Sequence, residues 1–302
     1  MIEGIGLTKN FISENNRKKH TRAIEDVDIR IDKGETLALI GESGCGKSTL
    51  GRILLNLIPP SQGEVLFEGQ NLAKMTPSEL RAIRWKFQIV SQHPDSALNP
   101  RWTVADSILE PFRIHSKMTG GRDQKRELER LIDLVGLEPE QAARFPHQLS
   151  GGELQRAVIA RAIALDPAFI VCDEPTSMLD VSIQASIIRL LQARQKEIKC
   201  GCLFITHDIQ LAKIMGDRIA VMLDGQIVEE GAGILDHPAH PFTQKIVSPD
   251  PHETVPELVP VCNCSSRACS YLPSCPSRSP LCNSYPKMQE YGDRRVRCHL
   301  LS

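Results

Sequence analysis

A glycine-rich stretch directly after an apolar run limits what this chain can fold into more than any other feature. Residues 41–49 read Gly-Glu-Ser-Gly-Cys-Gly-Lys-Ser-Thr, between the apolar run 36–40 and the helical pattern 50–57. Strand, glycine loop and helix in this order are the context of a phosphate-binding P-loop. The glycines allow successive N–H groups to face one anion, and the helix N-terminus adds partial positive charge. We therefore expect bound nucleotide; the alternative is a chance glycine turn.

Two residues of the P-loop carry specific chemistry. Lys47 can reach the β- and γ-phosphates of a nucleoside triphosphate, and the Ser48 hydroxyl can ligate Mg²⁺. The predicted phosphate-binding residues are Gly41, Glu42, Ser43, Gly44, Cys45, Gly46, Lys47, Ser48 and Thr49.

Length and composition exclude several classes of protein. The 302 residues suffice for one large domain and a smaller appendage, and 41% are hydrophobic, which is enough for a packed core. The net charge of −1 provides no global attraction for nucleic acid or anionic lipid. No run approaches the roughly 20 apolar residues of a membrane span, and residues 1–4 lack signal-peptide character. We predict a cytosolic protein that can dock on a membrane protein.

Strand-like and helical patterns alternate through most of the chain. Four apolar runs follow the P-loop at residues 87–92, 168–172, 202–206 and 219–223, with helical patterns between most of them. This alternation predicts an α/β fold with a mostly parallel, doubly wound sheet.

Other segments depart from that alternation. Residues 2–8 and 24–31 resemble strands, and the polar insert 13–20 between them is expected to be a solvated hairpin loop; a basic binding patch is the alternative. Residues 103–165 show helical but no strand patterns, which predicts a helical insert. After residue 232 the chain becomes rich in Pro, His, Ser and Cys, which indicates a separate C-terminal segment.

A second nucleotide motif follows the apolar run 169–172. Asp173, at the end of the predicted strand, can hold Mg²⁺ beside the P-loop. Glu174 follows immediately and can orient or deprotonate an attacking water. An apolar run before Asp-Glu is a weak signal alone, but its pairing with an upstream P-loop is a strong one.

A third motif is the turn Ser150-Gly151-Gly152, followed by Glu153 and a helical pattern. Such a turn presents backbone N–H groups at a helix N-terminus and can cradle a second phosphate. The alternative is an ordinary helix cap. If the turn contacts the γ-phosphate in a partner subunit, ATP is clamped between two chains.

Together, these motifs resemble those of ATP-binding subunits of ABC transporters, over about residues 1–250. The resemblance implies a RecA-like mostly parallel core sheet, a small antiparallel β-subdomain, and a helical subdomain at about 103–165 in an ATPase domain 1–232. Residues 41–49 match Walker A, and Asp173 with Glu174 matches the end of Walker B and its catalytic glutamate. Residues 149–153 match the signature motif, in which Glu153 replaces the usual Gln.

The same resemblance implies roles for further residues. Gln92 matches the Q-loop glutamine, which senses the metal ion, the water and the membrane partner. His207 matches the switch histidine, which contacts the γ-phosphate, and Asp180 belongs to the D-loop. Phe11 is the candidate for stacking on adenine, with Ile24 nearby; the alternative is that Phe11 closes the β-subdomain.

Three stretches resemble dipeptide, oligopeptide and nickel importers in particular. These are residues 92–101 and 240–243, and the cysteine-rich extension 233–302. The resemblance implies that four cysteines of such an extension bind a [4Fe–4S] cluster. In this chain they are Cys269, Cys275, Cys282 and Cys298. From the residues alone, four thiolates fit a cubane cluster or zinc, although no C-x-x-C pair is present. Free thiols are a further alternative, and Cys262 and Cys264 are left over.

The resemblance implies the ATPase motor of a peptide or nickel importer at the cytoplasmic face of the membrane. Its expected partners are a second, non-identical ATPase subunit, two transmembrane permease subunits and an extracytoplasmic substrate-binding protein, with no nucleic acid. The expected cofactors are ATP, Mg²⁺ and a [4Fe–4S] cluster. The alternatives are a soluble ABC-type ATPase without a transporter and a redox-sensing regulatory ATPase.

Overall fold

A mixed sheet carries the P-loop near its middle in the structure, a computed structural model that describes residues 1–13, 16–116, 120, 123–177, 179–248 and 268–301. The strand order is β11-β12-β10-β9-β3-β8-β7-β6. The parallel strands are β3 (Thr36–Gly41), β6 (Phe87–Val90), β7 (Phe169–Asp173), β8 (Gly201–Ile205) and β9 (Arg218–Leu223). Strands β3, β7 and β8 are buried throughout, as expected for parallel strands covered on both faces.

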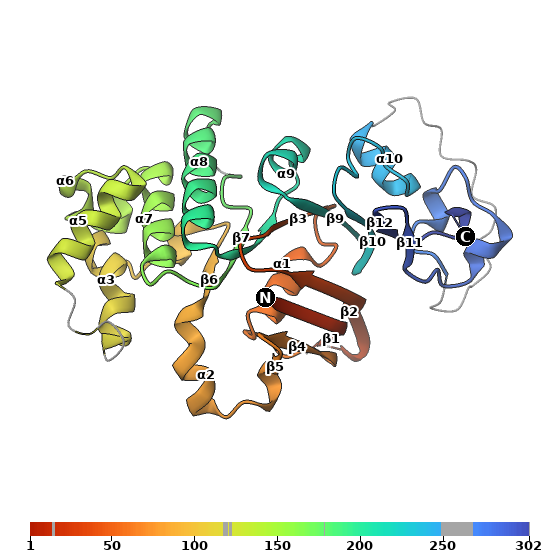
Figure 1. Ribbon diagram of the computed structural model, residues 1–302, viewed down its shortest axis with the longest axis horizontal. Helices are drawn as coiled ribbons and strands as arrows, with labels where there is room; N and C mark the ends of the chain where they lie inside the picture. Colours follow the sequence, from red (N-terminus) through yellow and green to blue (C-terminus); the bar gives the residue numbers. More distant parts are fainter. Residues whose placement is uncertain (14–15, 117–119, 121–122, 178, 249–267, 302) are drawn as a thin grey trace.

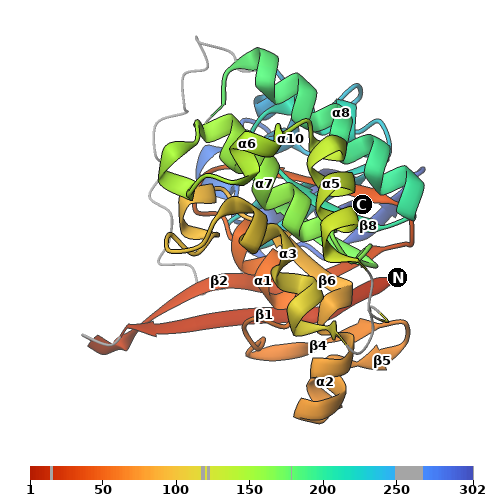
Figure 2. The ribbon, with the colours of Figure 1, turned by 90° about the vertical axis from the view of Figure 1, so that its left-hand side faces the viewer.

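A second, antiparallel sheet has the order β2-β1-β4-β5. It contains β1 (Ile2–Ser13), β2 (Asn16–Ile31), β4 (Gln62–Phe67) and β5 (Gln70–Asn71). The predicted hairpin loop at 13–20 was wrong, because β1 and β2 continue almost to the tip of a long hairpin (Figure 2). Backbone pairing such as Phe11 with Thr21 extends a ladder whatever the polarity of its side chains.

Helices cover both faces of the mixed sheet. Helix α1 (Lys47–Leu54) lies between the two sheets, and α8 (Val181–Ile198) and α9 (Ile209–Met215) lie on the opposite face (Figure 1). Leu50, Ile53 and Leu54 of α1 are buried in a core shared with both sheets. This packing fixes the helix N-terminus at the end of β3.

The predicted helical subdomain is present at one end of the molecule (Figure 1). It contains α3 (Val104–Ile114), α5 (Gln124–Val135), α6 (Pro139–Ala142) and α7 (Gly151–Ile163). Thr103 caps α3, since its side chain accepts a hydrogen bond from the Asp106 N–H. The separate helix α2 (Pro77–Ile83) follows β5.

The C-terminal residues lie at the opposite end from the helical subdomain (Figure 1) and add strands to the P-loop sheet. Strand β12 (Arg294–Val296) pairs antiparallel with β10 (Gln226–Gly231) and with β11 (Gln289–Tyr291). Helix α10 (Pro241–Val247) precedes them. Short 3₁₀ turns lie at Leu72–Lys74, Arg84–Lys86, Pro94–Ser96, Pro146–Gln148, Leu272–Ser274, Pro280–Asn283 and His299–Leu301.

Candidate nucleotide site

The P-loop, between β3 and α1, adopts a conformation that requires glycine. Gly46 has a φ of 110°, and a Cβ at this position would lie 2.3 Å from the carbonyl oxygen of Ala23. Lys47 is 6% exposed, and its Nζ donates to the carbonyl oxygens of Gly41 and Glu42 over 2.8 and 2.9 Å. The lysine thus lies over its own loop and can exchange these carbonyls for phosphate oxygens.

Ser48 and Asp173 meet at the edge of the P-loop. Ser48 Oγ donates to Asp173 Oδ1 over 3.0 Å, which joins the first turn of α1 to the end of β7. Burial raises the pKa of Asp173, the Ser48 hydrogen bond opposes this rise, and the neighbouring charge of Glu174 adds to it. A hydroxyl and a buried carboxylate are hard oxygen ligands, so the pair fits Mg²⁺. A bound divalent cation would favour the ionised form of Asp173.

Glu174 links Gln92 with His207. Gln92 Nε2 donates to Glu174 Oε2 over 3.0 Å, and His207 Nδ1 lies 3.4 Å from Oε1 of the same carboxylate. Glu174 has a φ of 47°, a left-handed conformation that is unusual for a residue with a side chain and is common at functional sites. The three predicted residues therefore converge from the ends of β6, β7 and β8, beside a cleft that includes Ser177 and Thr206.

The turn Ser150-Gly151-Gly152 forms the start of α7. Ser150 is its N-cap, and a capping box joins Ser150 to Glu153. Among the described residues, Glu153 also accepts from Gln141, and Gly152 packs against Ile183 of α8. Within one chain the turn thus contacts other parts of the helical subdomain and α8, while Ser150 and Gly151 are exposed and Gly152 is buried.

The remaining predicted site residues are Asp180 and Phe11. Asp180 is the N-cap of α8 and accepts from the backbone N–H of Ile183 over 3.1 Å. Phe11 is 43% exposed on β1, and the Lys9 ammonium lies 5.3 Å from the centre of its ring. Ile24, by contrast, is fully buried against Gly46.

Sequence reasoning did not include the β9–β10 turn in the site. Gly225 N–H donates to the carbonyl oxygen of Cys45 over 2.9 Å, so this turn supports the P-loop directly. Asp224 and Gly225 form the turn that joins β9 to its antiparallel partner β10. No local sequence pattern indicates that Gly225 contacts Cys45, which lies 180 positions earlier.

The four cysteines of the extension lie in one small region. Cys269 N–H donates to the carbonyl oxygen of Cys282, and all four are free thiols. Burial raises the pKa of Cys269, Cys275 and Cys298, and nearby thiols reinforce this. Within the described part of the chain, no group of three or more His, Cys, Asp or Glu side chains is arranged to hold a metal ion. Residues 262 and 264 lie outside the described residues.

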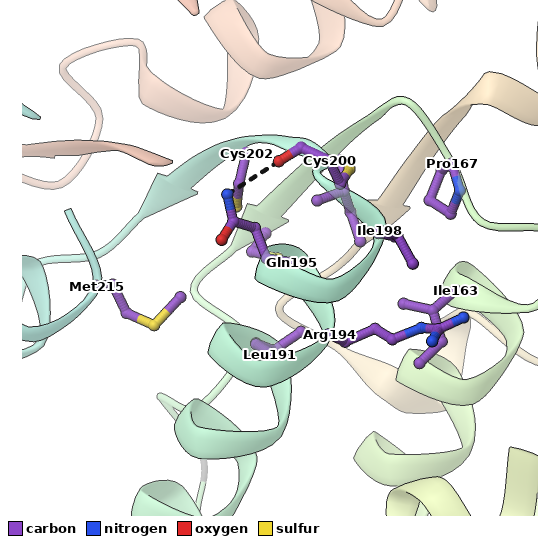
Figure 3. A pocket seen from close by; sticks show the side chains of 11 residues that line it. Ile163, Pro167, Leu191, Arg194, Gln195, Ile198, Cys200, Cys202 and Met215 are labelled. Carbon is purple, nitrogen blue, oxygen red and sulfur yellow. Dashed lines mark hydrogen bonds between the residues drawn. The ribbon is translucent and has the colours of Figure 1, made fainter. Parts of the chain in front are cut away.

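An apolar cavity behind the sheet is distinct from the nucleotide site. Figure 3 shows Leu191 and Ile198 of α8 facing Cys200 and Cys202, with Gln195 bonded to the Cys200 carbonyl oxygen over 3.0 Å. Its volume of about 20 Å³ holds at most a water molecule. We interpret it as a packing gap.

The comparisons with known proteins agree with this geometry. Residues 24–177 match the family model described as ABC transporter. The chain belongs to the ABC transporter family. It is 41% identical over 300 residues to the putative oligopeptide transport ATP-binding protein YkfD of Bacillus subtilis (strain 168), covering 94% of this chain and 91% of that protein. It is 38% identical to the putative peptide import ATP-binding protein BAB2_1053 of Brucella abortus (strain 2308), covering 92% and 86%.

Solved structures of ABC cassettes share the fold. The dimeric post-hydrolysis state of the ATP-binding cassette MJ0796 bound to ADP and Pi has a TM-score of 0.69 and 30% identity, covering 77% of this chain and 98% of that one. The comparisons therefore confirm three predictions for this chain: the ABC transporter family, the fold class and ATP-hydrolase activity. The similar proteins favour an importer ATPase over a soluble ATPase without a transporter. No helix in the described part of this chain has the length and apolarity needed to span a membrane.

Proposed function

We propose that this chain is the ATP-hydrolysing subunit of an ABC importer that takes up peptides, with nickel as the alternative cargo. The observation that carries the proposal is the convergence of Gln92, Glu174 and His207 beside the Ser48–Asp173 pair. The names of the similar importer proteins support the cargo class.

In the proposed mechanism, Lys47 and the P-loop N–H groups bind the ATP phosphates. Ser48 and Asp173 would hold Mg²⁺, which neutralises charge on the phosphate oxygens when bound. Gln92 and His207 orient the Glu174 carboxylate, which accepts a proton from the attacking water. His207 lines the cleft and its side chain is 61% exposed, so it is accessible for the proposed contact with the γ-phosphate.

A second ATPase subunit, non-identical to this one, would complete each site. We propose that Ser150, Gly151 and Gly152 of one chain, with Glu153 behind them and Asp180 beside them, close over the ATP bound to the partner. Two exposed features support this: Ser150 and Gly151 at the N-terminus of α7, and Val181, which is 82% exposed next to Asp180. Phe11 would stack on adenine with the ring face that Lys9 leaves open.

The remaining partners are two transmembrane permease subunits and an extracytoplasmic substrate-binding protein; no nucleic acid is expected. We place the chain at the cytoplasmic face of the membrane. A permease helix would fit the apolar groove between the end of α1 and α2, lined by Leu57, Leu72, Leu80 and Phe87. Leu57 is 46% exposed there, and Phe87 begins the strand that leads to Gln92.

Uptake of a labelled peptide tests the proposal. Cells that lack the chain should regain ATP-dependent uptake when they express it together with its membrane subunits, and Lys47→Ala should prevent this. Purification in detergent should recover the membrane subunits with the chain. Purification of the chain without any membrane subunit, together with failure to restore uptake, would instead favour the soluble ATPase, and uptake of nickel but not peptide would change the cargo.

We also propose that residues 233–302 form a separate extension of the ATPase domain 1–232, in which Cys269, Cys275, Cys282 and Cys298 bind a [4Fe–4S] cluster. The gathering of the four free thiols supports it. A [4Fe–4S] cluster and a zinc ion would each use four thiolates, but in the cluster each thiolate binds a different iron. An absorption spectrum under anaerobic conditions, with iron and zinc analysis, tests this.

If the extension is instead a redox sensor, ATP turnover should depend on the oxidation state of these thiols. Replacement of all four by serine should then remove that dependence. Equal turnover in oxidising and reducing conditions would exclude the redox-sensing alternative.

A further inference from the structure

Arg297 occupies an internal position where three parts of the chain meet. It follows β12 and is 4% exposed. Its Nε donates to the carbonyl oxygen of Ile227 in β10 over 3.2 Å, and its Nη2 donates to the carbonyl oxygen of Asp26 in β2 over 3.0 Å. Its Nη1 donates to the Tyr285 hydroxyl over 2.7 Å. One guanidinium therefore joins the extension to both sheets.

The bond to Asp26 supports an unfavourable backbone conformation. Asp26 has a φ of 48°, in the left-handed region that residues with side chains rarely adopt. Arg297 Nη1 also lies 3.5 Å from Asp26 Oδ2, so both the carbonyl and the carboxylate of this residue face the cation. The guanidinium thus fixes the path of β2 at this point.

The path from Asp26 to the P-loop is short. Glu25 N–H donates to the carbonyl oxygen of Gly225, and Gly225 N–H donates to the carbonyl oxygen of Cys45, each over 2.9 Å. Gly46 also packs against the carbonyl oxygen of Ala23. A shift of β2 at residues 23–26 would therefore displace the segment that presents N–H groups to phosphate.

We propose that Arg297 is a positioning residue for ATP binding, through which the C-terminal extension holds residues 23–26 and the β9–β10 turn against the P-loop. The inference rests on the proposed nucleotide site. In this role Arg297 makes the affinity for nucleotide depend on the C-terminal extension. Glu174, Gln92 and His207 lie outside this network, so Arg297 should affect the binding of ATP and leave the chemical step unchanged.

The first test is Arg297→Gln in the full chain, measured with fluorescent ATP and by steady-state hydrolysis. The Kd and KM for ATP should rise roughly 3- to 30-fold, the range of coupling carried by residues remote from a ligand, with kcat within about 2-fold of the wild type. Arg294→Gln is the matched control, since Arg294 is the first residue of β12 but contacts Glu229 and the His237 carbonyl. Its Kd should stay within about 2-fold of the wild type.

A second variant separates positioning from a general loss of structure. Glycine adopts the left-handed conformation without cost, so Asp26→Gly should restore much of the ATP affinity that Arg297→Gln loses. If Arg297 only stabilised the fold in general, Asp26→Gly would not restore the ATP affinity, because glycine adds no contact in place of the lost guanidinium. Thermal unfolding of each variant confirms that the measured protein is folded.

The outcomes distinguish this inference from the proposed function. If the wild type binds ATP and Arg297→Gln binds it equally well, the positioning role is refuted and the nucleotide site stands. If Arg297→Gln weakens binding but Asp26→Gly does not restore it, the path through Asp26 is wrong. If the wild type itself binds no ATP, the proposed function fails first.

Discussion

Gln92 donates a hydrogen bond to Glu174, with 3.0 Å between Nε2 and Oε2. The bond crosses from the segment after β6 to the end of β7, so a side chain from another part of the sheet holds the Glu174 carboxylate. His207 Nδ1 approaches the other oxygen at 3.4 Å. Both oxygens of Glu174 thus have a polar neighbour, which defines the orientation of this carboxylate toward the cleft.

Glu174→Gln should abolish most ATP hydrolysis while ATP binding persists. An amide keeps the shape of the side chain and a partner for Gln92, but it cannot accept a proton from water. The loss of a general base lowers turnover by about 10²- to 10⁴-fold. Fluorescent ATP binding and phosphate release, measured on the same preparation, check both halves of the prediction. Turnover near the wild-type rate would remove Glu174 from the proposed mechanism.

Ser48→Ala should selectively weaken the binding of Mg²⁺. Ser48 and Asp173 share a hydrogen bond of 3.0 Å, and loss of the hydroxyl removes one hard oxygen ligand. We expect the Mg²⁺ concentration for half-maximal hydrolysis to rise roughly 10- to 100-fold, while ATP binding in EDTA stays unchanged. An equal loss with and without Mg²⁺ would mean that Ser48 acts on the phosphates or the fold.

The pKa of Asp173 adds a pH dependence to this experiment. Burial raises that pKa, so protons compete with Mg²⁺ at a higher pH than at an ordinary carboxylate. The Mg²⁺ concentration that the wild type requires should therefore increase as the pH falls, whereas Asp173→Asn should require a high Mg²⁺ concentration at every pH. A titration of hydrolysis against Mg²⁺ at several pH values measures this.

The sequence was informative about the nucleotide site because its motifs are local. The P-loop, Asp173 and Glu174 each follow a buried strand, and parallel strands bring their carboxyl ends to one edge of the sheet. That rule sufficed to predict that Ser48 and Asp173 would meet.

The remaining structure depends on contacts between distant residues. Arg297 and Asp26 are separated by 271 positions, so no local pattern could connect them. Strands β11 and β12 are three residues each and include Glu290 and two arginines, so they lack the apolar alternation typical of strands. The buried Glu229 and Glu230 form ion pairs with these two arginines, Arg294 and Arg295.

Glu153→Gln should strengthen ATP-driven association of the ATPase subunits. The Glu153 carboxylate accepts from the Ser150 N–H and hydroxyl over 2.7 and 2.8 Å, and these bonds lower its pKa, so it is charged at neutral pH. In the proposed dimer this charge would oppose the γ-phosphate and compete for the Ser150 hydroxyl. Glutamine preserves the capping box without the charge.

The gain should be modest, because Glu153 lies near solvent. We expect the Kd of the dimer to fall about 2- to 5-fold, which corresponds to the strength of an exposed charge pair. Sedimentation with ATP in a Glu174→Gln background measures it for this chain with its partner subunit. Glu140→Gln removes an exposed carboxylate from the same subdomain and is the control. A weaker dimer in Glu153→Gln would show that the carboxylate itself contributes to closure.

His240 should make the stability of the chain fall in acid. It is the N-cap of α10, where its Nδ1 accepts from the Phe242 N–H over 3.0 Å, and burial lowers its pKa to about 4. The ordinary value is about 6.5, so between these pH values the unfolded chain binds a proton that the folded chain excludes. Folding stability is then fully present above about pH 6.5 and declines by about 3 kcal/mol as the pH falls to about 4.

His240→Asn isolates this contribution, because asparagine can cap a helix and does not titrate. The free energy of unfolding in urea should depend less steeply on pH in this variant than in the wild type, between pH 6.5 and 4. The exposed His237 offers the matched control, and His237→Asn should keep the wild-type slope. Equal slopes in all three proteins would mean that His240 takes up its proton while folded. In that case the Phe242 N–H would have to find another acceptor, because a protonated imidazole has no lone pair to offer.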